Sequence, residues 1–235
     1  MTGFQFQKMD AIFFDFEGTL VNFQWKLEAA VDETLTALSL SGFPRDLYGD
    51  NPGYAQIYNH TLRLSSRETS PGEQSPQRKI MDAIYDRYDL DALTRWRLYP
   101  DTADVLSLLK QSNHKLGLIS NIGNTALTAA LEQLNIARFL DIVVSRNEMP
   151  FLKPHPEGLL TAAQTLGLSP DRILFVGDSR NDVAAAHAAG MRACYLVGGE
   201  DTPEKLNAFS PDLTVTTLSQ LPELLKSDIP YFPKK

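Results

Sequence analysis

Two acidic segments of the chain each follow directly on a short apolar run. One comprises residues 15–19 (DFEGT) and the other residues 177–182 (GDSRND). Carboxylate oxygens are the ligands that a hard cation such as Mg²⁺ takes in proteins. If the two segments lie together, Asp15 and Asp178 could hold such a cation, which would offset the repulsion between carboxylates and an anionic substrate. An Asp at such a place can also simply cap a turn, so the accompanying residues decide.

Polar residues also follow two further apolar runs. Ser120 and Asn121 come directly after one of them, and Lys153 precedes Pro154 in the loop after the other. Hydroxyl, amide and ammonium groups can donate hydrogen bonds to an anion. Each pair alone means little, because a Lys beside a turn is usually a solvated surface residue. The four motifs in this order, each at the end of an apolar run, are hard to obtain by accident.

The composition is that of a globular protein without general positive charge. The 235 residues are 43% hydrophobic and 22% charged, which is ample for a buried core. The formal net charge is −7, so no protein-wide basic field would attract nucleic acid. No apolar run approaches the roughly 20 residues of a membrane span, and no secretory signal begins the sequence. We therefore expect a cytoplasmic protein that binds neither nucleic acid nor a membrane.

Apolar runs alternate with segments of helical spacing through most of the chain. The runs are too short for helices and predict strands buried on both faces, at residues 11–14, 116–119, 142–144, 173–176, 193–197 and 213–215. Helices are predicted at residues 102–111, 125–134, 157–166 and 182–189. This alternation predicts an α/β fold, a Rossmann-like parallel sheet with helices on both faces. Ligands of such sheets lie at the carboxyl ends of the strands, where the polar motifs are found.

The segment 22–99 interrupts the alternation, because it contains no convincing strand. Its spacing predicts helices at residues 25–39, 54–64 and 77–88, with a loop at residues 65–75. It leaves the sheet after the first strand and returns before the second, so it would stand over the carboxyl edge as a lid. We predict a core of residues 1–21 and 100–235 and a helical cap of residues 22–99. Residues 1–8 are expected to be dispensable for folding.

The polar motifs, each at the end of a predicted strand, resemble the four motifs of the haloacid dehalogenase-like superfamily. These are an Asp-x-Asp-x-Thr, a Ser or Thr, a Lys or Arg, and a paired acidic motif. The match covers nearly the whole chain, and the segment 22–99 stands where the phosphoglycolate phosphatase-like branch carries a helical cap. The resemblance implies a Mg²⁺-dependent phosphatase.

The resemblance also implies a role for each acidic residue. Asp15 would be the nucleophile that takes the phosphoryl group from the substrate. Asp15 and Asp178 would hold the Mg²⁺, with the backbone carbonyl of Glu17 as a further ligand. Asp182 would support the metal or its waters. The alternative for Asp182 is an acid in the first turn of a helix, where the helix dipole favours it.

Three further residues are expected to contact the phosphate. Ser120 and the amide groups beside Asn121 would hydrogen-bond the oxygens that are transferred. Lys153 would supply fixed positive charge to the phosphate and to Asp15, so that preorganised electrostatics stabilise the transition state. Gly18 would form the turn of the first motif.

The sequence departs from the family pattern at Glu17. In phosphatases of the family this position is normally Asp, which donates a proton to the leaving oxygen and later activates the water that cleaves the phospho-aspartate. Glu keeps the carboxylate but adds a methylene, which displaces the group unless its rotamer compensates. A misplaced general acid forfeits part of a contribution of about 10²- to 10⁴-fold. We therefore expect Glu17→Asp to raise turnover, unless the surrounding loop is shaped around Glu.

Three functions stay open at this point. We favour hydrolysis of small phosphate monoesters, supplied as phosphorylated metabolites, with Mg²⁺ and a phospho-aspartate on Asp15. A haloacid dehalogenase fits less well, because those relatives use no metal and lack the paired acidic motif. The third is a catalytically weak binding or regulatory protein, for which Glu17 is the only sequence argument. Neither the natural substrate nor the oligomeric state follows from the sequence.

Overall fold

The computed structural model describes residues 9–65, 74–206 and 208–226. Its centre is a six-stranded sheet with the strand order β3-β2-β1-β4-β5-β6, in which all neighbouring strands are parallel. The strands are β1 (Ala11–Phe14), β2 (Lys115–Ile119), β3 (Ile142–Val144), β4 (Ile173–Gly177), β5 (Arg192–Leu196) and β6 (Leu213–Val215). The predicted α/β fold is therefore confirmed.

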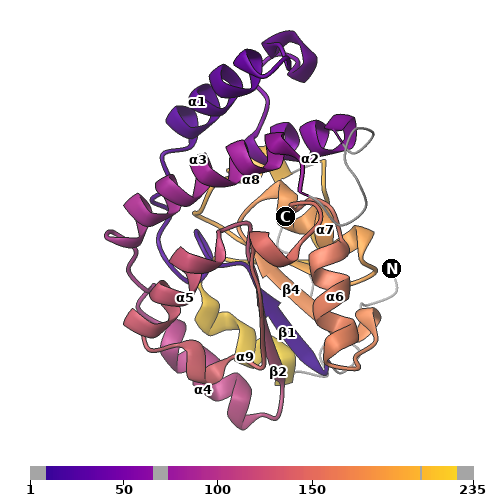
Figure 1. Cartoon of the computed structure of the whole chain (residues 1–235). Helices are drawn as coiled ribbons and strands as arrows, with labels where there is room; N and C mark the ends of the chain where they lie inside the picture. The colour runs from indigo at the N-terminus through magenta and orange to yellow at the C-terminus, as the bar shows by residue number, and fades with distance from the viewer. Residues whose placement is uncertain (1–8, 66–73, 207, 227–235) are drawn as a thin grey trace.

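Helices cover both faces of this sheet (Figure 1). They are α4 (Thr102–Gln111), α5 (Asn124–Gln133), α6 (Glu157–Thr165), α7 (Arg180–Ala188), α8 (Pro203–Leu206) and α9 (Leu221–Lys226). In Figure 1, α4, α5 and α9 lie on one side of the sheet and α6 and α7 on the other. Gly167 and Gly190, just beyond α6 and α7, have φ angles of +66° and +74°, the left-handed conformation in which glycine commonly closes a helix.

The central strands consist of continuous apolar residues because both of their faces are covered. All four residues of β1 are buried. Phe13 of β1 lies opposite Gly117 of β2, where a Cβ would come within 2.6 Å of the Phe13 ring. Glycine at this position therefore makes room for an aromatic ring in the core. Phe14 is level with Val176 of β4, so the residues after these two strands emerge at the same height.

The segment between the first two strands is helical, as predicted. It contains α1 (Leu27–Leu40), the 3₁₀ helix η1 (Arg45–Tyr48), α2 (Tyr54–Ser65) and α3 (Pro76–Leu93). α3 extends beyond its predicted end at residue 88. It begins at Pro76 because the Ser75 side chain accepts a hydrogen bond from the backbone N–H of Arg78 at 3.1 Å. Figure 1 shows the three α-helices together at one end of the molecule.

The helical segment has an aromatic centre. The ring centroids of Trp25, Tyr54 and Tyr85 lie between 5.1 and 6.2 Å apart. Such contacts stabilise the packing of the helices beyond the burial of apolar area. The division into core and cap stays a prediction. Residues 1–8, which are expected to be dispensable, and most of the predicted loop at residues 65–75 lie outside the described residues. No helix within the described ranges has the length and apolar character to cross a membrane.

Candidate active site

Three of the predicted metal-binding residues meet at the carboxyl edge of the sheet. Asp15 follows β1, Asp178 follows β4, and Asp182 lies in the first turn of α7. All three are buried, and one carboxylate oxygen from each lies within 4.8 Å of the others. Asp182 also caps its own helix, since its Oδ2 accepts a hydrogen bond from the Ser179 backbone N–H at 3.0 Å. Its two predicted roles, at the site and in the first helical turn, are therefore compatible.

The three carboxylates repel one another. Burial raises the pKa of Asp15 to about 6, against the lowering effect of Lys153. Burial, followed by the charges of Asp182 and Asp15, holds the pKa of Asp178 well above its usual value. A cation among these oxygens would relieve both the repulsion and the loss of hydration. An all-oxygen donor set of this kind fits Mg²⁺.

Two glycines make room for the Asp178 carboxylate. A Cβ on Gly18 or on Gly199 would clash with it, and Gly18 has a φ of +82°, which side chains rarely adopt. The remaining position is fixed by hydrogen bonds. Thr19 Oγ1 donates to Oδ1 at 3.2 Å, and the backbone N–H of Glu200 donates to Oδ2 at 2.5 Å. The loop after β1, including Gly18 as predicted, is thus built around this carboxylate.

Lys153 is the cation of the site. Its Nζ lies 2.5 Å from Asp15 Oδ1 and 2.7 Å from Asp182 Oδ1, and it donates to the carbonyl of Ile119 at 3.0 Å. Its side chain is only 3% exposed, so it is not a solvated surface Lys. Burial alone would lower the pKa of Lys153, but the charges of Asp15 and Asp182 raise it above the usual value. The ammonium group therefore stays charged beside Asp15.

Ser120 and Asn121 follow β2 and are both buried. Ser120 Oγ accepts a weak hydrogen bond from the backbone N–H of Ile122 at 3.4 Å. The Asn121 side chain joins three segments: its Oδ1 accepts from the backbone N–H of Lys153 at 3.0 Å, and its Nδ2 donates to the Tyr54 hydroxyl at 3.0 Å. Asn121 thereby fixes the loop of Lys153 against the start of α2.

Glu17 is held in one defined position. Its Oε1 accepts hydrogen bonds from the backbone N–H groups of Gln24 and Trp25, at 2.6 and 2.7 Å, and from the indole N–H of Trp96 at 2.8 Å. Its Oε2 receives no hydrogen bond from the described residues. Burial raises the pKa of Glu17 to about 7, although the bond from Trp96 and the two backbone bonds lower it. A carboxyl group of this pKa can both donate and accept a proton near neutral pH.

These contacts bear on the departure from the family pattern. The longer side chain is not left displaced, because the Glu carboxylate meets three donors where chain segments enter and leave the helical region. The geometry favours the second of the two expectations, a loop shaped around Glu. That the backbone carbonyl of Glu17 is a metal ligand stays a prediction.

Three neighbours of the site were not predicted. Tyr54 and Trp96 belong to the helical segment, whose path back over the sheet no local pattern specifies. Glu200 follows β5, and the rule that ligands lie after strands in parallel sheets could have found it. Burial, then the charges of Asp182 and Asp201, raises the pKa of Glu200 to about 8.

Comparisons with known proteins agree with this geometry. A family model described as haloacid dehalogenase-like hydrolase matches residues 9–190. The phosphoglycolate phosphatase of Salmonella paratyphi A is 34% identical, with 92% of each chain covered. That of Escherichia coli K12 is 32% identical, again with 92% of each chain covered.

Solved structures share the fold. A predicted phosphoglycolate phosphatase from Haemophilus somnus 129pt matches with a TM-score of 0.65 at 23% identity, over 94% of this chain and 100% of that one. A dehalogenase matches with a TM-score of 0.60 at 20% identity, over 94% and 98% of the two chains. The fold alone therefore does not separate phosphatases from dehalogenases.

The chain belongs to the haloacid dehalogenase-like hydrolase family, as its motifs predicted. The two curated relatives named above, which match over nine tenths of its length, are phosphoglycolate phosphatases. The protein is accordingly an enzyme of the phosphatase type, a hydrolase of phosphoric monoesters.

Proposed function

We propose that the protein hydrolyses small phosphate monoesters with the help of Mg²⁺ and through a phospho-aspartate on Asp15. The observation that carries the proposal is the buried contact of Asp15 with Lys153, at 2.5 Å, beside the carboxylates of Asp178 and Asp182. A carboxylate that only stabilised the fold would not require a second pair of buried acids around it. The arrangement instead suits a nucleophile that must meet an anion.

In the first half of the reaction, an Asp15 oxygen attacks the phosphorus and the bond to the ester oxygen breaks. Glu17 donates its proton to that oxygen, which leaves as an alcohol. Lys153 and the Ser120 hydroxyl balance the charge on the phosphoryl oxygens, and they do so without reorganisation because both are buried and held.

In the second half, Glu17 is ionised and takes a proton from a water molecule. The hydroxide oxygen attacks the phosphorus, the bond to Asp15 breaks, and inorganic phosphate leaves. Each turnover returns the proton to Glu17 and the carboxylate to Asp15. A pKa of about 7 allows the same group to serve in both halves.

Mg²⁺ would be held by Asp15 and Asp178, with Asp182 and the backbone carbonyl of Glu17 in support. The donor set and the crowding of carboxylates fit the ion. When bound, it would supply positive charge that lowers the repulsion between Asp15 and the phosphate.

The relatives' name makes 2-phosphoglycolate the first substrate to test, followed by other small phosphorylated metabolites. A cytoplasmic location stays a prediction.

The test is release of inorganic phosphate from an aryl phosphate and from 2-phosphoglycolate, with and without Mg²⁺. We expect turnover that depends on Mg²⁺. If the protein binds phosphate but turns over neither ester with any metal, the regulatory function replaces the proposal. If it releases chloride from a haloacid without metal, the dehalogenase function replaces the proposal.

A further inference from the structure

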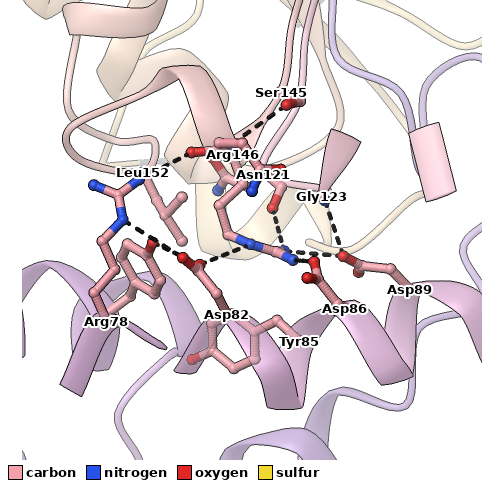
Figure 2. A network of polar contacts seen from close by, with 12 residues as sticks. Arg78, Asp82, Tyr85, Asp86, Asp89, Asn121, Gly123, Ser145, Arg146 and Leu152 are labelled. Carbon is pink, nitrogen blue, oxygen red and sulfur yellow. Dashed lines mark hydrogen bonds and ion pairs between the residues drawn. The ribbon is translucent and has the colours of Figure 1, made fainter. Parts of the chain in front are cut away.

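A buried arginine outside the site joins the helical segment to the sheet. Arg146 lies two residues after the end of β3, at the start of the 3₁₀ helix η3 (Arg146–Glu148), and its side chain is 1% exposed. Its guanidinium meets three aspartates of α3 (Figure 2). Nε lies 3.2 Å from Asp82 Oδ1, Nη1 lies 2.9 Å from Asp89 Oδ2, and Nη2 contacts Asp86 Oδ1. These aspartates are spaced to share one face of the helix.

The same guanidinium also contacts the loop after β2. Its Nη1 donates to the backbone carbonyl of Asn121 at 3.0 Å. Asp89, which contacts Arg146, also accepts a hydrogen bond from this loop, from the backbone N–H of Gly123 at 2.9 Å. Figure 2 shows the guanidinium between α3 and the loop, with Gly123 bonded to Asp89. Residues 121–123 are therefore fixed from both ends by the pair of Arg146 and Asp89.

These contacts set the orientation of a peptide group at the site. Because the peptide bond is planar and trans, the N–H of Ile122 points opposite to the carbonyl of Asn121. The carbonyl faces Arg146, and the N–H faces Ser120 Oγ at 3.4 Å. Turning the Asn121 carbonyl would therefore also turn the donor beside the Ser120 hydroxyl.

Close packing leaves little freedom in this arrangement. A Cβ on Gly123 would come within 2.6 Å of Arg146 Nη2 and would clash with the Asp86 carboxylate. Arg146 also lies over the face of the Tyr85 ring, at 5.6 Å from its centroid. Arginine suits the position because its planar fork carries five donors in fixed directions, whereas lysine presents a single point charge.

We propose that Arg146 is a positioning residue for the phosphate-binding loop. Through Asn121 and Asp89 it holds residues 120–123 in the conformation that binds the phosphoryl oxygens. The loop keeps this conformation only while Arg146 is in contact with α3. The helical segment then acts on phosphate binding through this loop, in addition to any contact with the rest of the substrate. The role in phosphate binding rests on the proposed function, but the positioning of the loop does not.

A second arginine provides a matched control. Arg78 of α3 is likewise mostly buried, lies 3.5 Å from Asp82 Oδ2, and donates to the carbonyl of Met149 at 3.0 Å. It thus also joins α3 to the sheet side of the molecule. Its Nη2 also lies 3.5 Å from the backbone carbonyl of Arg146, but among the described residues Arg78 makes no hydrogen bond or ion pair with residues 120–123. Loss of Arg78 therefore reports a weakened junction without a released loop.

The experiment compares Arg146→Lys with Arg78→Lys in the full chain. Three quantities are measured: the inhibition constant of inorganic phosphate, KM and kcat for an aryl phosphate, and hydrogen exchange of the backbone amides in residues 121–124. We expect Arg146→Lys to raise the inhibition constant and KM about tenfold, with a smaller change in kcat, since ground-state binding is affected. Exchange of residues 121–124 should accelerate by a similar factor. Arg78→Lys should change each quantity less than about twofold.

Equal effects of the two variants would overturn the proposal, because they would show a general loosening of the junction. Unchanged exchange and phosphate affinity in Arg146→Lys would overturn it as well. If Arg146→Lys fails to fold, Asp89→Asn takes its place, since the amide keeps the shape and an acceptor for Gly123 but loses the charge facing Arg146. It should give a smaller change in the same direction, and no change would reject the role. If the wild type turns over no phosphate ester, the proposed function fails while the exchange measurement still decides the role of Arg146.

Discussion

Shortening Glu17 tests how the site accommodates an acid longer than the family pattern. In Glu17→Asp the carboxylate is drawn back by about 1.5 Å, the length of one carbon–carbon bond. In the wild type, Glu17 Oε1 lies 2.6 to 2.8 Å from the backbone nitrogens of Gln24 and Trp25 and from the indole nitrogen of Trp96. At the longer separation these hydrogen bonds are lost unless the backbone follows the side chain.

The cost of this change is set by buried donors without partners. Each unsatisfied buried donor costs about 1–3 kcal/mol, and partial adjustment of the loop leaves about 2–4 kcal/mol for the variant as a whole. The proton donor also moves away from the leaving oxygen. We expect kcat for alkyl phosphates to fall at least about tenfold, which corresponds to about 1.4 kcal/mol of transition-state stabilisation. Aryl phosphates, whose leaving groups need little proton donation, should lose less.

The assay combines kcat for one alkyl and one aryl phosphate with urea unfolding. Glu28→Asp, at an exposed position in the first turn of α1, removes one methylene from a Glu outside the site and serves as the control. A Glu17→Asp variant that is as stable as the wild type and faster on alkyl phosphates would show that the loop is not shaped around Glu. That outcome would mean that the three hydrogen bonds restrain the acid in a poor position.

Three further predictions follow from the same contacts. In Trp96→Phe the indole bond that lowers the pKa of Glu17 is lost, so the pKa should rise from about 7 by roughly one unit. Since the alkyl ester needs protonated Glu17, the fall of kcat/KM at high pH should shift upward by the same amount, and an unshifted profile would argue against Glu17 as the acid. The raised pKa also means that folding favours the protonated form, so the contribution of Glu17 to stability is fully present below about pH 4.5 and is lost as pH rises through about 7. In urea unfolding without metal, Glu17→Gln should remove about 3 kcal/mol of that decline. An unfolding free energy that depends on pH in the same way in variant and wild type would contradict the assigned pKa. Asp178→Asn should raise the Mg²⁺ concentration needed for half-maximal activity by about tenfold or more, whereas an unchanged requirement would remove Asp178 from the metal site.

The strands and the positions of the main acidic residues could be predicted because they follow from local patterns. Buried parallel strands are continuous apolar runs, so the sheet places whatever follows each run at one edge. Asp15 and Asp178 lie together for this reason. Lys153 could be placed near them only through the resemblance, because a loop residue carries no periodic signal.

Contacts across the helical segment could not be predicted. The partners of Glu17 and Arg146 depend on how α3 returns to the sheet, and this is decided by packing between segments far apart in the sequence. In the sequence Arg146 cannot be told from an ordinary surface residue. Its burial is explained only by the three aspartates of α3 that surround it in the fold. The end of α3 was underestimated for a related reason, since the part of the helix beyond residue 88 begins with Asp89, which bonds to Gly123 across the junction.

The most direct test of the mechanism is detection of the phosphoryl group on Asp15. Wild-type protein with Mg²⁺ and an aryl phosphate is quenched in acid during steady turnover, digested and analysed by mass spectrometry, with Asp15→Asn treated in parallel. In the wild type we expect a phosphorylated peptide whose modified residue is Asp15. The folded variant should give no phosphopeptide and less than about 1% of the wild-type turnover. Steady turnover by the wild type without any label on Asp15, or substantial turnover by Asp15→Asn, would rule out Asp15 as the nucleophile.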